Sequence, residues 1–278
     1  MAAFMSVCTR PRELRRVDAH VVDATGEWAR KGPRTVRSRL LMRWRGLLWA
    51  ARHPLAYLVA TEGRRFDSRL GIETEGAAEP SELTIAHGDP GSGFSYVPTP
   101  LRLGRVWLAA LPPDRKRFTF IDMGSGKGRV LALAASSGFG RVVGVEFARE
   151  LHELASSNAT AASERGVNFE PLLIDAATYR FPSGPLVVHF NNPFDESVMT
   201  NVLQNLNESY QHEPRAIVVV YQQAAHEKPE HMTKNLELLA ETPFLVGRTL
   251  EPDGWIDRRV LAGYLVRVFE SPELRQTL

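Results

Sequence analysis

A chain of 278 residues, 44% of them hydrophobic, has the size and composition of a water-soluble fold of one or two domains. It contains no run of about 18 apolar residues, no secretory leader pattern and a single cysteine, Cys8. These features argue against a membrane span, secretion, a disulfide within the chain and a cysteine-built zinc site, so we expect a cytoplasmic protein. The net charge of +2 hides an asymmetry: residues 1–70 carry 15 Lys and Arg against 6 Asp and Glu (net +9), whereas residues 71–278 carry 19 against 26 (net −7).

Residues 1–65 read as a basic, partly helical extension in front of a domain expected over residues 66–278. Between Val36 and Leu55, apolar residues recur at intervals of three and four, which predicts an amphipathic helix broken near Pro54. Its arginines could bind a nucleic-acid backbone, an anionic membrane surface or an acidic partner through residues 30–60. Alternatively, the helix covers the following domain with its apolar stripe and leaves its arginines in water.

Beyond the extension, a connector rich in glycine and proline over residues 71–98 leads into a helix over residues 99–111, with Thr99 as its N-cap. Strand and helix patterns then alternate. Strands are expected at 118–123, 141–146, 168–174, 185–191 and 215–221, and helices at 128–138, 148–164, 195–210 and 229–241. Two apolar runs, 244–250 and 260–269, predict an antiparallel pair joined by a long turn. Such alternation predicts an α/β fold, with a doubly wound, mostly parallel sheet that binds ligands at the carboxyl ends of its strands.

The most informative segment is Asp122-Met123-Gly124-Ser125-Gly126-Lys127-Gly128, a glycine turn between a buried strand and a helix. Glycine lacks a Cβ atom, so the chain can turn sharply and a ligand can approach the backbone amides. Glu146 ends the next strand 18 residues after Gly128, close to the distance at which an acidic residue meets a ribose in βαβ nucleotide-binding units. The spacing G-x-G-x-G differs from the dinucleotide-binding G-x-G-x-x-G, and no Ser or Thr follows Lys127 as a P-loop requires. A glycine turn in another kind of α/β protein is the alternative.

This pattern resembles motif I of the class I, seven-strand S-adenosylmethionine-dependent methyltransferases. The resemblance covers about residues 66–269 and includes the stretch from Phe66 to Thr74, which looks like a lead-in of bacterial proteins of unassigned methyltransferase function. It implies a seven-stranded sheet in the order 3-2-1-4-5-7-6 and S-adenosyl-L-methionine as cofactor. The amino-acid end of the cofactor would lie against the motif residues Asp122, Gly124, Ser125, Gly126 and Gly128. Glu146 would hold both ribose hydroxyls.

The resemblance also assigns cofactor contacts outside motif I. Asp175, after the third strand, would accept a hydrogen bond from the adenine amine, and Ala176 would line the face of the ring. The segment beginning at Tyr96 resembles the one before motif I in small seven-strand protein lysine methyltransferases, where Tyr96 or Thr99 would close over the methionine end. A solvated turn aspartate is the alternative for Asp175, and buried packing is the alternative for Tyr96.

Asn191-Asn192-Pro193-Phe194, at the end of the fourth strand, resembles the D/N/S-P-P-Y/F/W motif of amino-group methyltransferases. The side-chain oxygen of Asn191 and the carbonyl of Pro193 can accept hydrogens from an amine, while Phe194 excludes water. Asn192 stands where the first proline should be, which argues against methylation of nucleic-acid bases and leaves amine or lysine methylation open. A plain turn with a helix N-cap at Asp195 is the alternative.

Other chemistry finds little support in the sequence. The eight histidines show no metal-binding spacing, so no metal site is expected, and His189 reads as a core histidine. The sequence therefore predicts an S-adenosylmethionine-dependent methyltransferase whose net acidic domain attracts a protein lysine or another amine. Two alternatives stay open: an RNA methyltransferase recruited by the arginine-rich extension, and a non-catalytic nucleoside-binding scaffold.

Overall fold

The structure, a computed structural model, describes residues 54–224, 229–252 and 254–277. The predicted extension therefore lies outside the described residues up to position 53. The chain divides into two compact units, Met1–Ala56 and Tyr57–Leu278, and the architecture below is that of the second. The first described helix, α3 (Pro54–Leu70), begins three residues before the second unit and runs across the domain boundary expected at residue 65. Among the described residues, no helix is long and apolar enough to cross a lipid bilayer.

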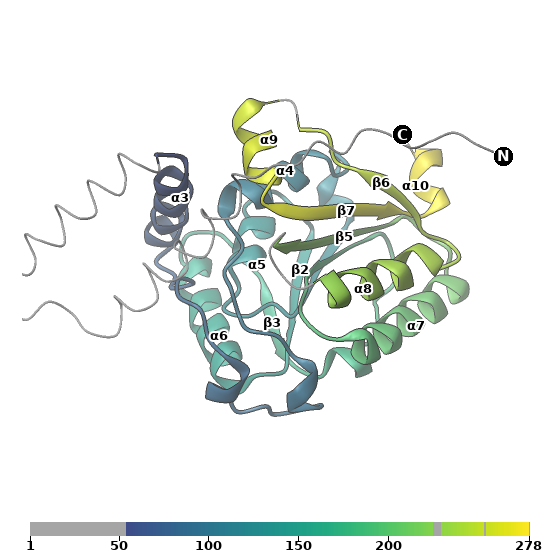
Figure 1. Cartoon of the computed structure of the whole chain (residues 1–278), viewed down its shortest axis with the longest axis horizontal. Helices are drawn as coiled ribbons and strands as arrows, with labels where there is room; N and C mark the ends of the chain where they lie inside the picture. The colour runs from purple at the N-terminus through teal and green to yellow at the C-terminus, as the bar shows by residue number, and fades with distance from the viewer. Residues whose placement is uncertain (1–53, 225–228, 253, 278) are drawn as a thin grey trace, which may run out of the picture. The chain divides into compact units, whose positions relative to one another are not determined.

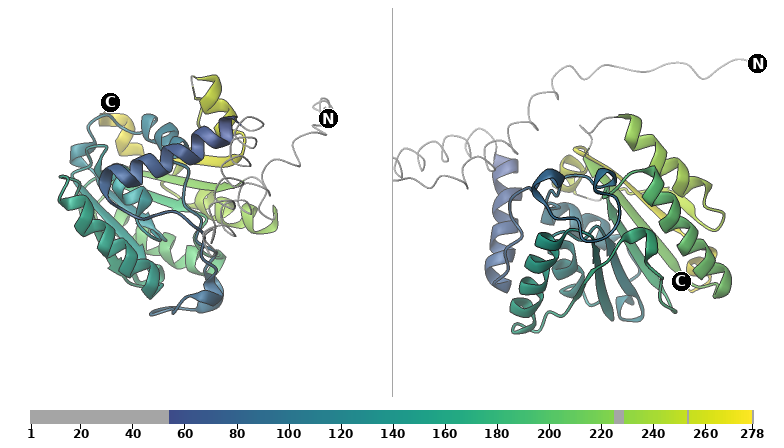
Figure 2. Two further views of the ribbon diagram at one scale, coloured as in Figure 1. Left: turned by 90° about the vertical axis from the view of Figure 1, so that its left-hand side faces the viewer. Right: turned by 90° about the horizontal axis from the view of Figure 1, so that it is seen from below.

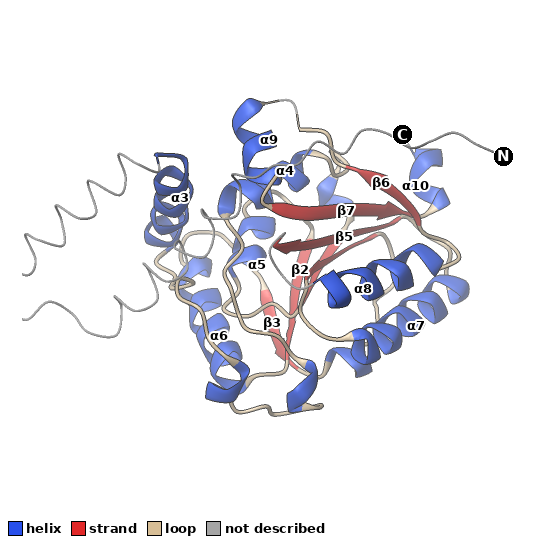
Figure 3. Ribbon diagram, in the orientation of Figure 1, coloured by secondary structure: helices blue, strands red, loops and turns tan. Residues whose placement is uncertain are grey.

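Seven strands form one mixed sheet in the order β3-β2-β1-β4-β5-β7-β6 (Figures 1 and 3). The strands are β1 (Thr119–Met123), β2 (Arg141–Glu146), β3 (Glu170–Leu173), β4 (Leu186–Asn191), β5 (Ile217–Ala224), β6 (Val246–Thr249) and β7 (Tyr264–Glu270). Strands β1 to β5 pair in parallel, and β7 is antiparallel to both β5 and β6. The predicted α/β fold and strand order are confirmed.

Helices cover both faces of this sheet. They are α4 (Leu101–Ala109), α5 (Arg129–Ala135), α6 (Arg149–Ser163), α7 (Glu196–His212), α8 (Pro229–Glu241), α9 (Trp255–Leu261) and α10 (Pro272–Thr277). In the right-hand view of Figure 2 the strands run between the teal helices α5 and α6 on one side and the green helices α7 and α8 on the other. Asp195 caps the amino end of α7, as the alternative interpretation of residues 191–194 expected, because its carboxylate accepts from the amides of Ser197 and Val198.

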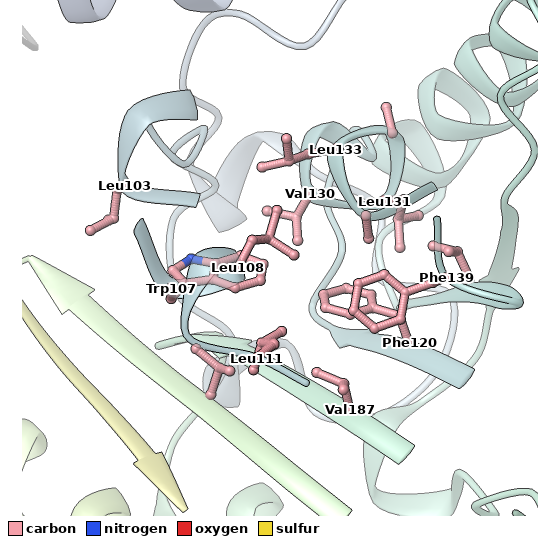
Figure 4. Packing of buried hydrophobic residues seen from close by; sticks show 14 of the residues in the cluster. Leu103, Trp107, Leu108, Leu111, Phe120, Val130, Leu131, Leu133, Phe139 and Val187 are labelled. Carbon is pink, nitrogen blue, oxygen red and sulfur yellow. The ribbon is translucent and has the colours of Figure 1, made fainter. Parts of the chain in front are cut away.

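Side chains alternate between the two faces of each strand, so each face has its own hydrophobic core. On one face, Trp107 of α4 and Phe120 of β1 pack with Leu131 of α5 (Figure 4). On the other face, Met199 and Leu206 of α7 pack against the sheet. Trp107 is fully buried and stacks on Phe120 and His189, which holds α4 against the sheet.

Two expectations about helix ends and turns were wrong. Thr99 does not cap α4, because Pro100 occupies the N-cap position and the helix begins at Leu101 without a side-chain cap. Residues 255–261, expected to form a turn and the start of a strand, form α9 instead. Ile256 and Val260 are four residues apart and both pack on the core, a helical spacing, and this explains why the last strand starts only at Tyr264.

Residues 80–99, which we call the roof segment, lie across the carboxyl ends of the central strands. The segment contains two short 3-10 turns, η2 (Pro80–Glu82) and η3 (Pro90–Ser92). The amide of Ala86 donates to the carbonyl of Phe147 (3.0 Å), and the amide of Phe94 donates to the carbonyl of Pro193 (3.2 Å). Its backbone is therefore paired with the loops that follow β2 and β4, although its sequence shows no strand or helix period.

Candidate functional site

A cavity lies between the roof segment and the carboxyl ends of the parallel strands. Every predicted site residue except Gly128 lines it. These residues are Tyr96, Thr99, Asp122, Gly124, Ser125, Gly126, Glu146, Asp175, Ala176, Asn191, Asn192, Pro193 and Phe194. They come from five separate segments of the chain, which the sheet topology brings together at one edge.

The glycines between β1 and α5 are required by backbone conformation and by close contacts. Gly124, Gly126 and Gly128 all have positive φ angles, of 83°, 53° and 84°. A Cβ atom on Gly124 would lie 2.4 Å from Cβ of Pro193, and one on Gly126 would lie 2.3 Å from the ring of Tyr96. Gly128 instead occupies the N-cap of α5, so it shapes the start of the helix and does not line the cavity.

Glu146 ends β2 with its carboxylate buried against the glycine turn. Its Oε2 atom accepts from the amide of Gly126 at 2.8 Å, and its Oε1 atom accepts from the amides of Phe147 (3.0 Å) and Ala148 (2.9 Å). Burial raises the pKa of Glu146 to about 6, and the three amide donors oppose that rise. The side chain is therefore an anionic hydrogen-bond acceptor at neutral pH.

Asp175 and Ala176 lie at the far end of the cavity, after β3. Asp175 caps the short turn η5 (Ala176–Thr178), and its Oδ1 atom accepts from the amide of Ala177 at 2.9 Å. A Cβ atom on Gly88 of the roof segment would lie 2.9 Å from Oδ2 of Asp175. The carboxylate thus has one oxygen in its own turn and the other against the roof segment. Ala176 is buried.

The tetrapeptide after β4 has a fixed conformation. Asn192 is the only non-glycine residue with positive φ (40°) among the described residues, and its Oδ1 atom accepts from the hydroxyl of Tyr221 at 2.9 Å. Proline fixes φ near about −65° and cannot adopt this conformation, which explains why the first proline of the resembling motif is missing. The Pro193 carbonyl already accepts from Phe94, and the ring of Phe194 is buried edge-to-face against Phe190.

His189 is a cavity residue that the sequence interpretation placed only in the core. It is fully buried as expected, and it also lines the cavity. It is the register partner of Asp122 across β1 and β4, and its Nδ1 atom lies 2.6 Å from Oδ1 of Asp122. His189 precedes Asn191 by two residues, so both side chains lie on the same face of β4. The alternation of side chains along a strand could therefore have placed His189 at the site from the sequence alone.

Arg129, the first residue of α5, holds the glycine turn to the segment that follows α3. Its guanidinium is buried, with Nη2 bound to Asp67 (3.1 Å) and Glu75 (2.5 Å) and Nε donating to the hydroxyl of Thr74 (2.6 Å). Burial alone lowers the pKa of Arg129, but the carboxylates of Asp67 and Glu75 raise it above its ordinary value. The hydroxyl of Tyr96 donates to the carbonyl of Thr74, so the roof segment joins the same network.

Comparison with known proteins yields solved structures alone, since no family model and no curated protein matches the chain. One is a protein of Pyrococcus horikoshii for which RNA methyltransferase activity has been suggested (18% identity, TM-score 0.43, covering 76% of this chain and 96% of that one). Another is the 16S rRNA N2 G1207 methyltransferase RsmC of Thermus thermophilus (20%, 0.45, 63% and 44%). A third is an RNA methyltransferase of Salinibacter ruber with bound S-adenosyl-L-homocysteine (22%, 0.37, 63% and 92%). The likeness is one of fold. At these identities and TM-scores it adds nothing about substrate.

Proposed function

We propose that this chain is an S-adenosylmethionine-dependent methyltransferase that methylates a nitrogen of a protein lysine or of another amine. One observation carries the proposal: the glycine turn, Glu146, Asp175 and Asn191 converge on a single cavity at the carboxyl ends of parallel strands. Two carboxylates and a stretch of bare backbone within one cavity match a ligand that has a ribose diol, an exocyclic amine and a polar tail.

In this proposal each carboxylate binds one part of the cofactor. Glu146 Oε2 accepts one amide bond whereas Oε1 accepts two, so Oε2 is the oxygen better able to accept from a ribose hydroxyl. Asp175 uses Oδ1 in its own turn, which leaves Oδ2 for the adenine amine. Tyr96 lies directly over Gly126 and covers the place assigned to the amino-acid end. When bound, the cofactor supplies a methyl group on a sulfonium.

Nitrogen is the acceptor favoured by the residues after β4. The carbonyl of Pro193 is engaged by the roof segment, so the side-chain oxygen of Asn191 is the group proposed to accept from the amine. Phe194 lines the cavity beside it and excludes water from the reacting nitrogen. The net charge of −7 over residues 71–278 favours the approach of a cationic substrate.

Calorimetry tests cofactor binding directly. We expect S-adenosylmethionine and S-adenosylhomocysteine each to bind with a stoichiometry of one. The Glu146→Ala variant should bind at least about tenfold more weakly, because a hydrogen bond to a charged group contributes about 1.5–3 kcal/mol. Glu170→Ala removes an exposed carboxylate that pairs with Arg141, and as a matched control it should bind like the wild type. If the wild type binds neither compound, the proposed function is wrong.

The acceptor class is tested with cofactor carrying a labelled methyl group, incubated with the protein and a cell lysate. Label in protein, recovered after hydrolysis as methylated lysine, is the expected result. Label recovered in RNA would instead assign the reaction to the alternative in which the basic extension recruits RNA. Tight cofactor binding without label in any fraction would leave the non-catalytic scaffold.

A further inference from the structure

A chain of buried hydrogen bonds connects Asn191 to the interior of the protein. The indole nitrogen of Trp107 donates to Oε1 of Gln222 at 3.0 Å, and Nε2 of Gln222 donates to the hydroxyl oxygen of Thr99 at 2.8 Å. The same hydroxyl oxygen accepts from Nδ2 of Asn191 at 3.2 Å. Trp107 and Gln222 are fully buried, and Thr99 is buried as well. Figure 4 shows Trp107 packed among the apolar side chains that hold its ring.

The two ends of this chain of bonds fix the orientation of both amide side chains. An indole N–H can only donate, so the atom of Gln222 that faces Trp107 is the oxygen, and its NH2 group must face Thr99. At the other end, Nδ2 of Asn191 also lies 3.4 Å from the carbonyl oxygen of Val97, which can only accept. The NH2 group of Asn191 therefore faces Thr99 and Val97, and its oxygen is the atom left for the cavity that Asn191 lines.

We infer that Gln222, held by Trp107, is a positioning residue that fixes the Thr99 hydroxyl beside Asn191. Thr99 and the Val97 carbonyl together then hold the NH2 group of Asn191 and keep its oxygen directed at the methyl acceptor. The acceptor is consequently a group that donates a hydrogen bond, such as an amine. A flipped Asn191 could accept from the Thr99 hydroxyl, but it would place its oxygen against the Val97 carbonyl and present N–H to the N–H of the amine, and these two contacts would be repulsive. The inference rests on the proposed function and adds two residues, Trp107 and Gln222, to the machinery of nitrogen recognition.

The test uses two ligands that differ at the reacting position, with no need to know the natural substrate. S-adenosylhomocysteine has a bare sulfur there, whereas sinefungin has a carbon bearing an amino group. The wild-type chain should bind sinefungin about tenfold more tightly than S-adenosylhomocysteine, because the ammonium donates to Asn191. In Gln222→Met and in Thr99→Val this preference should fall to about twofold or less. In Gln222→Met, whose side chain does not line the cavity, the Kd for S-adenosylhomocysteine should stay within about twofold of the wild type.

Two controls separate positioning from general damage. Thr99→Ser keeps the hydroxyl and should retain the preference for sinefungin, and Gln204→Met makes the same change as Gln222→Met on the exposed surface of α7. A preference that survives both Gln222→Met and Thr99→Val in folded protein would overturn the inference. So would an equal loss of affinity for both ligands, which indicates a merely structural role. Failure of the wild type to bind S-adenosylhomocysteine would contradict the proposed function itself.

Discussion

The buried position of Glu146 disfavours the charged form of its carboxyl group. Its side chain has 4% of its surface exposed, and the pKa rises from 4.5 to about 6 because desolvation outweighs the three amide donors. A carboxyl group whose pKa is raised on folding stabilises the protein fully below about pH 4.5, and this contribution disappears as the pH rises through about 6. Anionic Glu146 is thus kept at a cost to stability of about 2 kcal/mol at neutral pH.

The cost can be measured by comparing the wild type with Glu146→Gln, which has no ionisable group at this position. Between pH 4.5 and pH 7.5, the free energy of unfolding of the wild type should fall by about 2 kcal/mol relative to that of the variant. Urea unfolding at pH 4.5, 6 and 7.5 gives both curves. Parallel curves for the two proteins would show that Glu146 titrates at its ordinary pKa.

At the level of elements, the buried ion network of Arg129 joins α5 to α3. Asp67 of α3 and Arg129 of α5 are both buried, and the Asp67 carboxylate also binds the hydroxyl of Thr74. Removing one partner of a buried pair leaves the other charge without full compensation, which destabilises far more than the loss of an exposed pair. The position of the glycine turn therefore depends on an aspartate that precedes it by more than fifty residues.

Asp67→Ala should lower the free energy of unfolding by about 3 kcal/mol. The matched control is Glu170→Ala, which breaks the pair that Arg141 and Glu170 form with about half of each side chain exposed. That change should lower the free energy of unfolding by less than about 1 kcal/mol. Chemical denaturation of the three proteins under one condition makes the comparison, and equal effects of the two variants would contradict the importance given to the buried network.

The elements that sequence predicted well are those with a strong local signal. The parallel strands have continuous apolar runs, and Asp195 stands directly before a helical period. Thr99 was misassigned because a threonine before proline looks like a helix N-cap, whereas its hydroxyl is used by Gln222 and Asn191, both distant in sequence. The Asp122–His189 pair could not be predicted from local sequence either, because it depends on the register between β1 and β4. The roof segment was missed because it bonds to loops and so has no period of its own.

At the scale of the whole molecule, charge is divided unevenly along the chain. Residues 1–53 contain 12 Lys and Arg against 4 Asp and Glu (net +8), and residues 54–278 contain 22 against 28 (net −6). The helices and strands described above all lie after position 53, including α3 with its core residues Phe66 and Leu70. A deletion meant to test the basic extension should therefore end at residue 53, because one ending at residue 60 cuts into α3.

Deletion of residues 1–53 tests the alternative in which the basic extension recruits RNA, because it removes a net charge of +8 and keeps α3 and the seven strands. It should weaken binding to a short single-stranded RNA by at least tenfold at low salt, because about eight net positive charges are removed, and it should flatten the dependence of that binding on salt. Fluorescence anisotropy at several salt concentrations measures both effects. Equal RNA binding by the shortened chain would place the contact within residues 54–278.

The hydrogen bonds of Ala86 with Phe147 and of Phe94 with Pro193 also bear on how a bound cofactor would be released under the proposed function. These two links hold the roof segment over the cavity in which the proposed nucleoside would lie. Under the proposed function, the opening of these two links would be one step in the exchange of spent cofactor for fresh cofactor. Substitutions in residues 80–99 would accordingly alter the residence time of the product more than the strength with which it is held at equilibrium.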